Sequence, residues 1–400
     1  MGIPSNLVNN DNINFIQYNP LENVEFVAGI WLALLDKCQH SYFTSWGWIS
    51  NWIKSLPMES NVKLIVGYVK NEPVVAFFIG QKKENKYGLL PTSVISLNST
   101  SDPYYDQLYI EYNSILVDPS VSLNLDNLFG YLDLLKWDEF ILPGLSPNFV
   151  AEINLLDDGA SRRDYYMLIE EVASSFFVEL EKIRKAGMDY LKLLSSNKRS
   201  QIRRSIKQYE IDGNIQIQES KSLDEALLMF DNLVLLHQQE WEKRGKPGAF
   251  SNRYLLQFHK DLIRSRFDQN EIQLLHIYNN KMTIGYLYNF VYKQDVFFYQ
   301  SGFNYLAENT YRPGLVSHYF AIIHNTTKNM SNYDFLAGDS AYKSSLSTNS
   351  VSMYWVRLIK GKYRFYMKKR MVDIKTSLKS MPKIETHLKN IKYWLASFRK

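Results

Sequence analysis

Apolar and polar positions follow the same order twice along the chain. Residues 13–36 and residues 215–238 each begin with an alternating stretch typical of a strand and continue with apolar residues at helical spacing. Residues of the Asn, Ser and Pro type precede each helical part, where they favour a helix N-terminus. In the aligned segments Leu21 matches Leu223. The pattern therefore predicts a strand followed by a helix in each half.

A second helix and a hairpin follow in both halves. A serine that favours a helix N-cap precedes large apolar residues at i+3, i+7 and i+11, which share one helix face. The matched residues, offset by 206 positions, are Ser45, Trp48, Trp52 and Leu56 with Ser251, Tyr254, Phe258 and Leu262. Hairpin strands are expected at 64–69 and 74–79, and at 274–278 and 283–290, around turns that contain Asn.

This repeated order predicts an α/β fold, more strictly α+β, made of two tandem domains. Each domain is expected to be a mixed, mostly antiparallel sheet flanked by helices, and the region of about 150–212 connects the two. We place the N-terminal domain at 1–165, the C-terminal domain at 166–360 and a tail at 361–400. The alternative is a pair of unrelated α/β domains.

Charge is segregated along the 400 residues. The chain has a net charge of +5, yet residues 361–400 hold twelve basic and two acidic residues, which leaves residues 1–360 at −5. The positive charge therefore belongs to the tail and does not by itself indicate nucleic-acid binding.

The compartment follows from what the sequence lacks. The single cysteine, Cys38, excludes an internal disulfide and a cysteine-based zinc site, and we expect no metal. The N-terminus does not have the pattern of a signal peptide, and no apolar run approaches the roughly 20 residues that span a bilayer. With its Asn/Lys/Ile-rich, bacterial-looking composition, we expect a cytoplasmic protein.

The segment 236–250 is the first candidate for a site. Its helix is expected to end at Gly245, and Gly248 allows a tight turn. The cations near the helix end either complement the helix dipole, which spacing alone favours, or face an anionic ligand.

The segment 311–319 is the second candidate. Pro313 and Gly314 at a helix start leave backbone N–H groups free for an anion, and Arg312 adds a full positive charge. This transition, which follows the strand 296–302 containing Gln300, suits a pyrophosphate.

The segment 333–343 is the third candidate. An apolar strand runs into a turn at Gly338 and then into Tyr342 and Lys343. Tyr342 suits hydrogen-bond donation to an oxyanion or a leaving thiolate, and Lys343 suits charge neutralisation. The alternative is a surface lysine beside a half-buried tyrosine.

These blocks together resemble a known family. The basic run 195–204, then 236–250, then 311–314, then 334–343 resembles, in family order, the CelD/BioF2-like acyltransferases of the GNAT superfamily, which are related to FemABX-type peptidyltransferases. The resemblance covers about 190–345 clearly. It implies two fused GNAT-like domains and an acyl-CoA donor.

The resemblance also implies roles for single residues. The donor pyrophosphate position falls at Arg312–Val316, although the usual glycine-rich loop is reduced here to one Pro-Gly. Lys343 matches a lysine near the reacting groups of FemABX relatives. The residues assigned to donor binding are Arg312, Gly314, Leu315, Val316 and Gln300. Those assigned to the acceptor are Trp241, Arg244, Arg199, Arg203, Asp334 and Gly338.

The expected reaction is transfer of an acyl group, in particular acetyl, from acetyl-CoA or another acyl-CoA to an amine of a sugar, polysaccharide or cell-envelope precursor. The candidate bases are His237, Glu240 and Asp339. A covalent route through Cys38 is not expected, because a lone cysteine beside an apolar helix usually belongs to the core.

Two other functions stay open. Arg199, Arg203 and Lys207 form a basic stripe at i, i+4 and i+8. This stripe is either a solvated face or a surface for an anionic acceptor, including tRNA if the protein is a FemABX-like aminoacyl transferase. The third function is a non-catalytic binding protein on a degenerate GNAT pair.

The tail 361–400 is expected to contain a basic amphipathic helix. Its apolar stripe is Ile384, Leu388, Ile391, Leu395 and Phe398. Such a helix can lie on an anionic membrane, as a peripheral contact at the inner face. It can equally dock on the acidic body.

Overall fold

The computed structural model describes residues 13–86, 90–123, 125–152, 165–338 and 340–379. The elements of the first half are β1 (Asn14–Tyr18), α1 (Val24–Leu35), α2 (Trp46–Ser55), β2 (Val62–Val69), β3 (Glu72–Lys86), β4 (Leu90–Leu97), β5 (Leu116–Val117), α3 (Leu125–Leu132), β6 (Glu139–Leu145), α4 (Pro147–Glu152) and β7 (Tyr165–Glu179).

The remaining elements are α5 (Leu180–Lys185), α6 (Ser196–Tyr209), β8 (Gln216–Glu219), α7 (Leu223–Lys243), α8 (Arg253–Arg266), β9 (Ile272–Tyr278), β10 (Thr283–Tyr292), β11 (Asp295–Phe303), α9 (Pro313–Thr327), β12 (Asn332–Ala337), α10 (Ala341–Leu346), β13 (Asn349–Lys360) and α11 (Lys362–Lys379).

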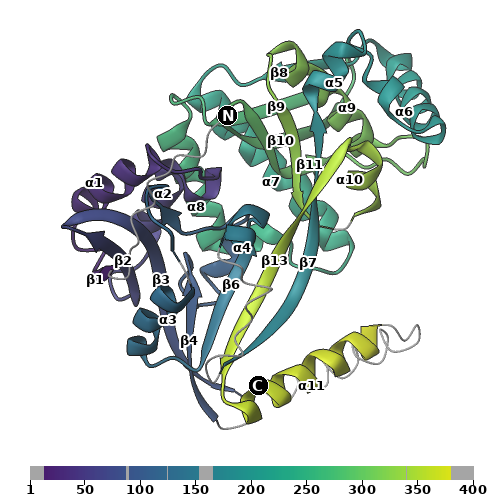
Figure 1. Cartoon of the computed structure of the whole chain (residues 1–400). Coiled ribbons are helices and arrows are strands. Elements are labelled where there is room, and N and C mark those ends of the chain that lie inside the picture. Colours follow the sequence, from purple (N-terminus) through teal and green to yellow (C-terminus); the bar gives the residue numbers. More distant parts are fainter. Residues whose placement is uncertain (1–12, 87–89, 124, 153–164, 339, 380–400) are drawn as a thin grey trace.

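The strands form one mixed sheet that runs through both halves (Figure 1). Their order is β1-β2-β3-β4-β6-β13-β7-β12-β11-β10-β9-β8, and β5 pairs with β3. Most neighbours are antiparallel, while β4 pairs with β6 and β11 pairs with β12 in parallel. The mixed α/β fold predicted from the sequence is therefore confirmed.

The order of elements also repeats as the pattern predicted. The series strand, helix, helix, hairpin is β1-α1-α2-β2-β3 in the first half and β8-α7-α8-β9-β10 in the second. Ser45 caps α2 by accepting from the Trp48 N–H, as expected. The matching cap at Ser251 is wrong, because Asn252 accepts from the first N–H groups of α8 and Ser251 lies in a preceding 3-10 turn.

Two long strands cross between the halves at the centre of the sheet. β7 follows the first half in sequence but pairs with β12, whereas β13 closes the second half and pairs with β6. β7 and β13 also pair with each other along their whole length, from Asn349 opposite Phe177 to Lys360 opposite Tyr165. Each half therefore borrows a strand from the other, and the domain boundaries at 165 and 360 stay a prediction.

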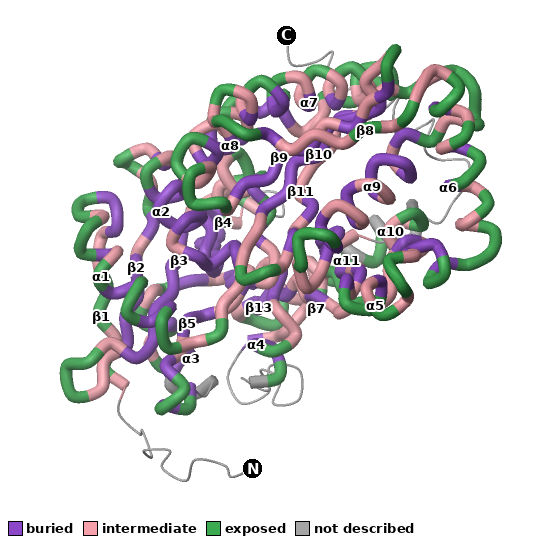
Figure 2. Tube along the Cα trace, turned by 90° about the horizontal axis from the view of Figure 1, so that it is seen from above, coloured by how far each residue is buried: buried purple, intermediate pink, exposed green. Residues whose placement is uncertain are grey.

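Helices cover both faces of the sheet (Figure 2). Alternate strand residues face opposite sides, so that Leu64 and Val66 join a core with α1, α2, α7 and α8, while Ile65 faces α3 and α4. In the second half the other face is covered by α5, α6 and α9.

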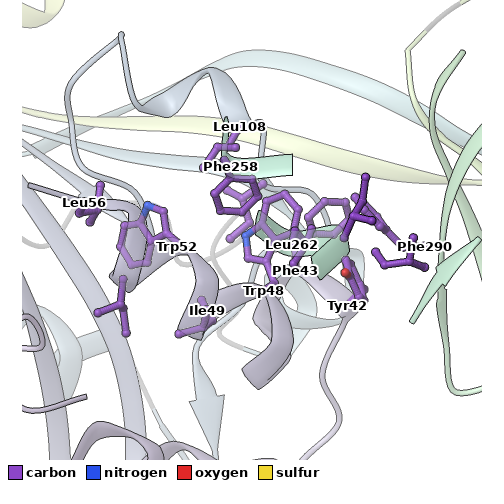
Figure 3. Close-up of a cluster of buried hydrophobic side chains, with 14 of the residues drawn as sticks. Tyr42, Phe43, Trp48, Ile49, Trp52, Leu56, Leu108, Phe258, Leu262 and Phe290 are labelled. Carbon is purple, nitrogen blue, oxygen red and sulfur yellow. The ribbon is translucent and has the colours of Figure 1, made fainter. Parts of the chain in front are cut away.

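The repeated helices α2 and α8 pack against each other in a core that both halves share (Figure 3). The Trp48 ring lies edge-on against Phe258 at 5.0 Å between centroids, and Tyr42 stacks on Phe290 at 4.4 Å. The Asn51 amide also donates to the Phe258 carbonyl at 3.1 Å. The two halves are thus joined by apolar packing as well as by strand exchange.

Candidate functional site

The parallel strands β11 and β12 separate towards their carboxyl ends. Their pairing covers only Asp295–Phe297 with Asn332–Asp334, although β11 continues to Phe303 and β12 to Ala337. β12 bulges before its end, where Leu336 adopts a φ of +59°. Separated strand ends followed by helix starts are a common place for ligands in α/β folds.

A cavity of about 1060 Å³ lies at these strand ends. Its walls are the end of α7 with the loop 246–249, the end of β11, the loop and first turn of α9, and the first turn of α10. The predicted site residues that line it are His237, Glu240, Trp241, Arg244, Gln300, Arg312, Gly314, Leu315 and Tyr342. Segments more than 100 residues apart in sequence thus meet at one cavity large enough for a cofactor-sized molecule.

One end of the cavity is built for an anion. α9 begins with Pro313 at its first position, and no side chain caps it. Lys198 of α6 and Arg312 both line the cavity there. Burial, and secondarily the Arg312 charge, lower the pKa of Lys198. Two cations held beside a helix N-terminus favour a negatively charged group between them.

Contacts with α6 fix this end. The Arg312 N–H donates to the Ser205 hydroxyl at 2.9 Å, and its guanidinium donates to the Gln201 side chain at 2.8 Å. These bonds hold Arg312 at the cavity wall. Among the described residues, no carboxylate forms an ion pair with its guanidinium. The position of Arg312 is thus fixed by α6.

The α7 wall carries a second group of predicted residues. Arg244 pairs with Glu240 at 2.7 Å and lies 5.6 Å from the centre of the Trp241 ring. His237 is held on both sides, since its Nδ1 lies 3.2 Å from the Ser301 carbonyl and its Nε2 accepts from the Ala249 N–H at 3.4 Å. Burial lowers the pKa of His237, so the ring is neutral at physiological pH. The geometry favours His237 as a brace between α7 and β11.

Tyr342 and Lys343 diverge at the start of α10. Tyr342 lines the cavity and stacks on His318 at 5.7 Å, and burial raises its pKa to about 12. Lys343 turns the other way, where its Nζ donates to the carbonyls of Leu336 (3.1 Å) and Ala337 (2.7 Å). Tyr342 therefore keeps its proton at neutral pH and faces the cavity, while Lys343 supports the bulge of β12.

The other predicted residues lie outside the cavity. Val316 is fully buried in the core, and Arg199 and Arg203 do not line the cavity. Gly338, at φ +128°, donates its N–H to the Ser174 carbonyl at 3.2 Å. Asp334 is buried and borders a second cavity of about 940 Å³. Asp339 lies outside the described residues.

One residue of the cavity wall, and one that contacts the end of β12 without lining the cavity, were not among the predicted ones. The first is Lys198; the sequence pattern pointed to its neighbour Arg199 instead. The buried Ile202 of α6 marks the inward face, and Lys198 stands one helical turn before it, so the helix phase could have identified it.

The second residue is Glu111, which comes from the first half. Its carboxylate accepts from the Ala337 N–H at 2.7 Å, and burial raises its pKa to about 7. Next to it, the Tyr112 hydroxyl donates to Asp334 at 2.5 Å. No pattern in the sequence pairs the loop at 111–112 with the bulge of β12.

Comparisons with known proteins agree with this geometry. Residues 196–344 match a family model described as an acetyltransferase (GNAT) domain. The structure of FemX aligns over 89% of this chain and 99% of its own, at 8% identity and a TM-score of 0.54, and so shares the fold. No curated protein matches the chain.

Two further structures are more distant. A tandem GNAT protein from the clavulanic acid biosynthesis pathway aligns over 88% of this chain and 99% of its own, at 9% identity and a TM-score of 0.46. L-PGS from Bacillus licheniformis aligns over 84% and 92%, at 10% identity and a TM-score of 0.46. Residues 196–344 are thus similar to a GNAT acetyltransferase domain, and the chain shares the fold of FemX. The CelD/BioF2-like assignment stays a prediction.

Proposed function

We propose that the protein is an N-acyltransferase that moves an acyl group, in particular acetyl, from acyl-CoA to an amine on a sugar or cell-envelope precursor. The observation that carries this proposal is the positively charged end of the cavity, where Lys198 and Arg312 flank the uncapped start of α9. It lies within the segment that matches the GNAT domain. The amine-bearing acceptor is a small envelope precursor in this proposal, and no metal takes part.

The donor's phosphates fit the residues present. Backbone N–H groups at Gly314 and Leu315 occupy the second and third positions of α9, where a helix has no internal partners for them. The single Pro-Gly therefore supplies free donors through the helix start, and the two cations supply the charge that a longer glycine loop lacks.

The cavity side chains support transfer to an amine. Acyl-CoA would supply an activated thioester. Tyr342 keeps its proton up to a pH near 12 and so can donate a hydrogen bond to the carbonyl oxygen or to the departing sulfur. Glu240, held by Arg244, is one of two carboxylates on the cavity wall, with Glu308, and in this proposal it accepts the proton of the amine. His237 positions the α7 wall, and Lys343 joins the start of α10, which carries Tyr342, to the bulge of β12.

Calorimetry with acetyl-CoA tests this function. Lys198→Gln removes a cation at the cavity, and Lys207→Gln removes an exposed cation from the same helix outside it. We expect Lys198→Gln to weaken acetyl-CoA binding about tenfold or more, because a charged hydrogen bond is lost. Lys207→Gln should bind within about twofold of the wild type.

The outcomes separate the alternatives. Absence of acetyl-CoA binding by the wild type refutes the acyl-CoA proposal. Stoichiometric binding without transfer to any amine would instead support a non-catalytic binding protein.

A second candidate is a FemABX-like aminoacyl transferase that uses charged tRNA. The observation in its favour is that Arg203, Arg204 and Lys207 are all exposed on the outer face of α6, the helix whose inner face carries Lys198 at the cavity. A steep loss of tRNA binding with salt, reduced in Arg203→Gln, would support it. Absence of tRNA binding at low salt would remove it.

A further inference from the structure

The C-terminal helix α11 contacts the body along one side only. It leaves the sheet at the end of β13 and extends away from it (Figure 1). Phe365 stacks on Tyr166 of β7 at 5.0 Å, and Lys368 pairs with Glu170 of the same strand at 2.9 Å. Arg364 adds an ion pair with Asp138 at 3.4 Å. Residues 364, 365 and 368 thus mark the face that holds the helix.

The opposite side of α11 carries an apolar stripe open to solvent. Its members are spaced at i, i+3, i+8 and i+11, which places them on one helix face. They are Tyr363 (68% exposed), Tyr366 (54%), Met371 (54%) and Ile374 (52%). A soluble surface helix normally turns such a face inwards, whereas α11 contacts the body through Arg364, Phe365 and Lys368. The stripe is therefore available to a partner.

Positive charge surrounds this stripe. Residues 362–379 hold seven Lys/Arg and one acidic residue. Lys362 and Lys369 are exposed along one side of the stripe, and the exposed Arg370 lies within it, one turn after Tyr366 and one turn before Ile374. An apolar face of Tyr, Met and Ile bordered by cations is the composition of helices that lie in the interface of an anionic bilayer.

We propose that α11 is a membrane-docking helix that binds the surface of a bilayer containing anionic lipid. An anionic bilayer accounts for both the charge and the apolar side chains of α11. Its headgroups attract the cations, and the boundary of its acyl chains accepts the stripe. Among the described residues, no helix combines the length and the apolar content that a bilayer span requires.

Other possible occupants of the exposed face of α11 fit it less well than lipid does. A second copy would bring the same basic face against itself. The segment 380–400, which lies outside the described residues and contains the predicted apolar stripe of the tail, has five basic residues and one acidic residue, so it would also be repelled. A nucleic acid would satisfy the cations and leave the apolar side chains in water.

Co-sedimentation of the full chain with vesicles tests the proposal. We compare vesicles of phosphatidylcholine alone with vesicles in which about a third of the lipid is phosphatidylglycerol. The test variant is Tyr366→Ser with Ile374→Ser. The matched control is Leu228→Ser with Leu235→Ser, which removes two residues of similar exposure (63% and 56%) from α7.

The expected result is binding to the anionic vesicles, none to the neutral ones, and a loss of about tenfold or more in the stripe variant. A further variant, Lys369→Gln with Arg370→Gln, should lose about fivefold for each cation. The α7 control should bind like the wild type.

Three results would overturn the proposal. The wild type could fail to bind anionic vesicles, or the stripe variant could bind them as well as the wild type. The third result is a wild-type protein that is dimeric in solution and a stripe variant that is monomeric. Failure here leaves the proposed reaction untouched, because acetyl-CoA binding at the α9 cavity is measured without lipid. The stripe variant should keep that binding.

Discussion

Replacing Glu111 with Gln should make the protein more stable at high pH. Glu111 is partly buried between the halves, and burial raises its pKa to about 7 from an ordinary value of 4.5. A raised carboxyl pKa means that the folded state favours the neutral acid. Its contribution to stability is therefore present below about pH 4.5 and is lost as the pH rises through 7.

The size of the effect follows from that shift. Each pKa unit corresponds to about 1.36 kcal/mol. Ionisation of Glu111 therefore lowers the free energy of unfolding by about 3 kcal/mol as the pH rises from about 4.5 to above 7. Glu111→Gln is neutral at every pH, and its amide oxygen can still accept from the Ala337 N–H. The variant should match the wild type within about 1 kcal/mol near pH 5. It should exceed the wild type by about 3 kcal/mol near pH 8.

Urea unfolding at the two pH values measures the difference. Asp118→Asn is the control of opposite sign, because hydrogen bonds from Ser120 and Lys37 outweigh burial and lower the pKa of Asp118. That variant should be less stable than the wild type near pH 8. If Glu111→Gln differs from the wild type equally at both pH values, Glu111 has an ordinary pKa and the reasoning is wrong.

Three further changes test the core and the site. Trp48→Ala should lower the free energy of unfolding by about 3–5 kcal/mol, because Trp48 is 2% exposed in the core between the halves, and a loss under 1 kcal/mol in urea unfolding would contradict that role. Tyr342→Phe should lower kcat for transfer by about a hundredfold or more while acetyl-CoA binding stays within twofold; an unchanged kcat would remove Tyr342 from the chemistry. Lys343→Ala should abolish transfer, because the Leu336 and Ala337 carbonyls lose their donor, while the circular dichroism spectrum stays that of the wild type. Wild-type turnover in this variant would refute the role of Lys343 at the site.

The sequence predicted the local structure well and the long-range contacts poorly. Period and capping signals located α2, the hairpins and the Pro313 start of α9, since these depend on neighbours a few residues apart. The cap of α8 was misplaced by one residue because Ser251 and Asn252 are both good caps. The pairing of β13 with β6 joins segments about 200 residues apart, and no local cue sets it.

The same division holds for the site. Loops after predicted strands were good candidates, and residues on them such as Tyr342 and Arg312 do line the cavity. The direction of each side chain does not follow from these patterns: Tyr342 faces the cavity, whereas its neighbour Lys343 turns to the β12 bulge. Glu111 could not be predicted, because its position depends on how the two halves pack.

The exchange of β7 and β13 sets a constraint on the order of synthesis. On the ribosome the first half emerges with β6 complete, yet the neighbour of β6 is β13, which is translated about 200 residues later. Until then β6 is an unprotected sheet edge of the kind that promotes misassembly. A chain truncated before residue 349 should therefore be protease-sensitive in both halves. Chaperones that shield nascent strands would matter most while the second half is being made.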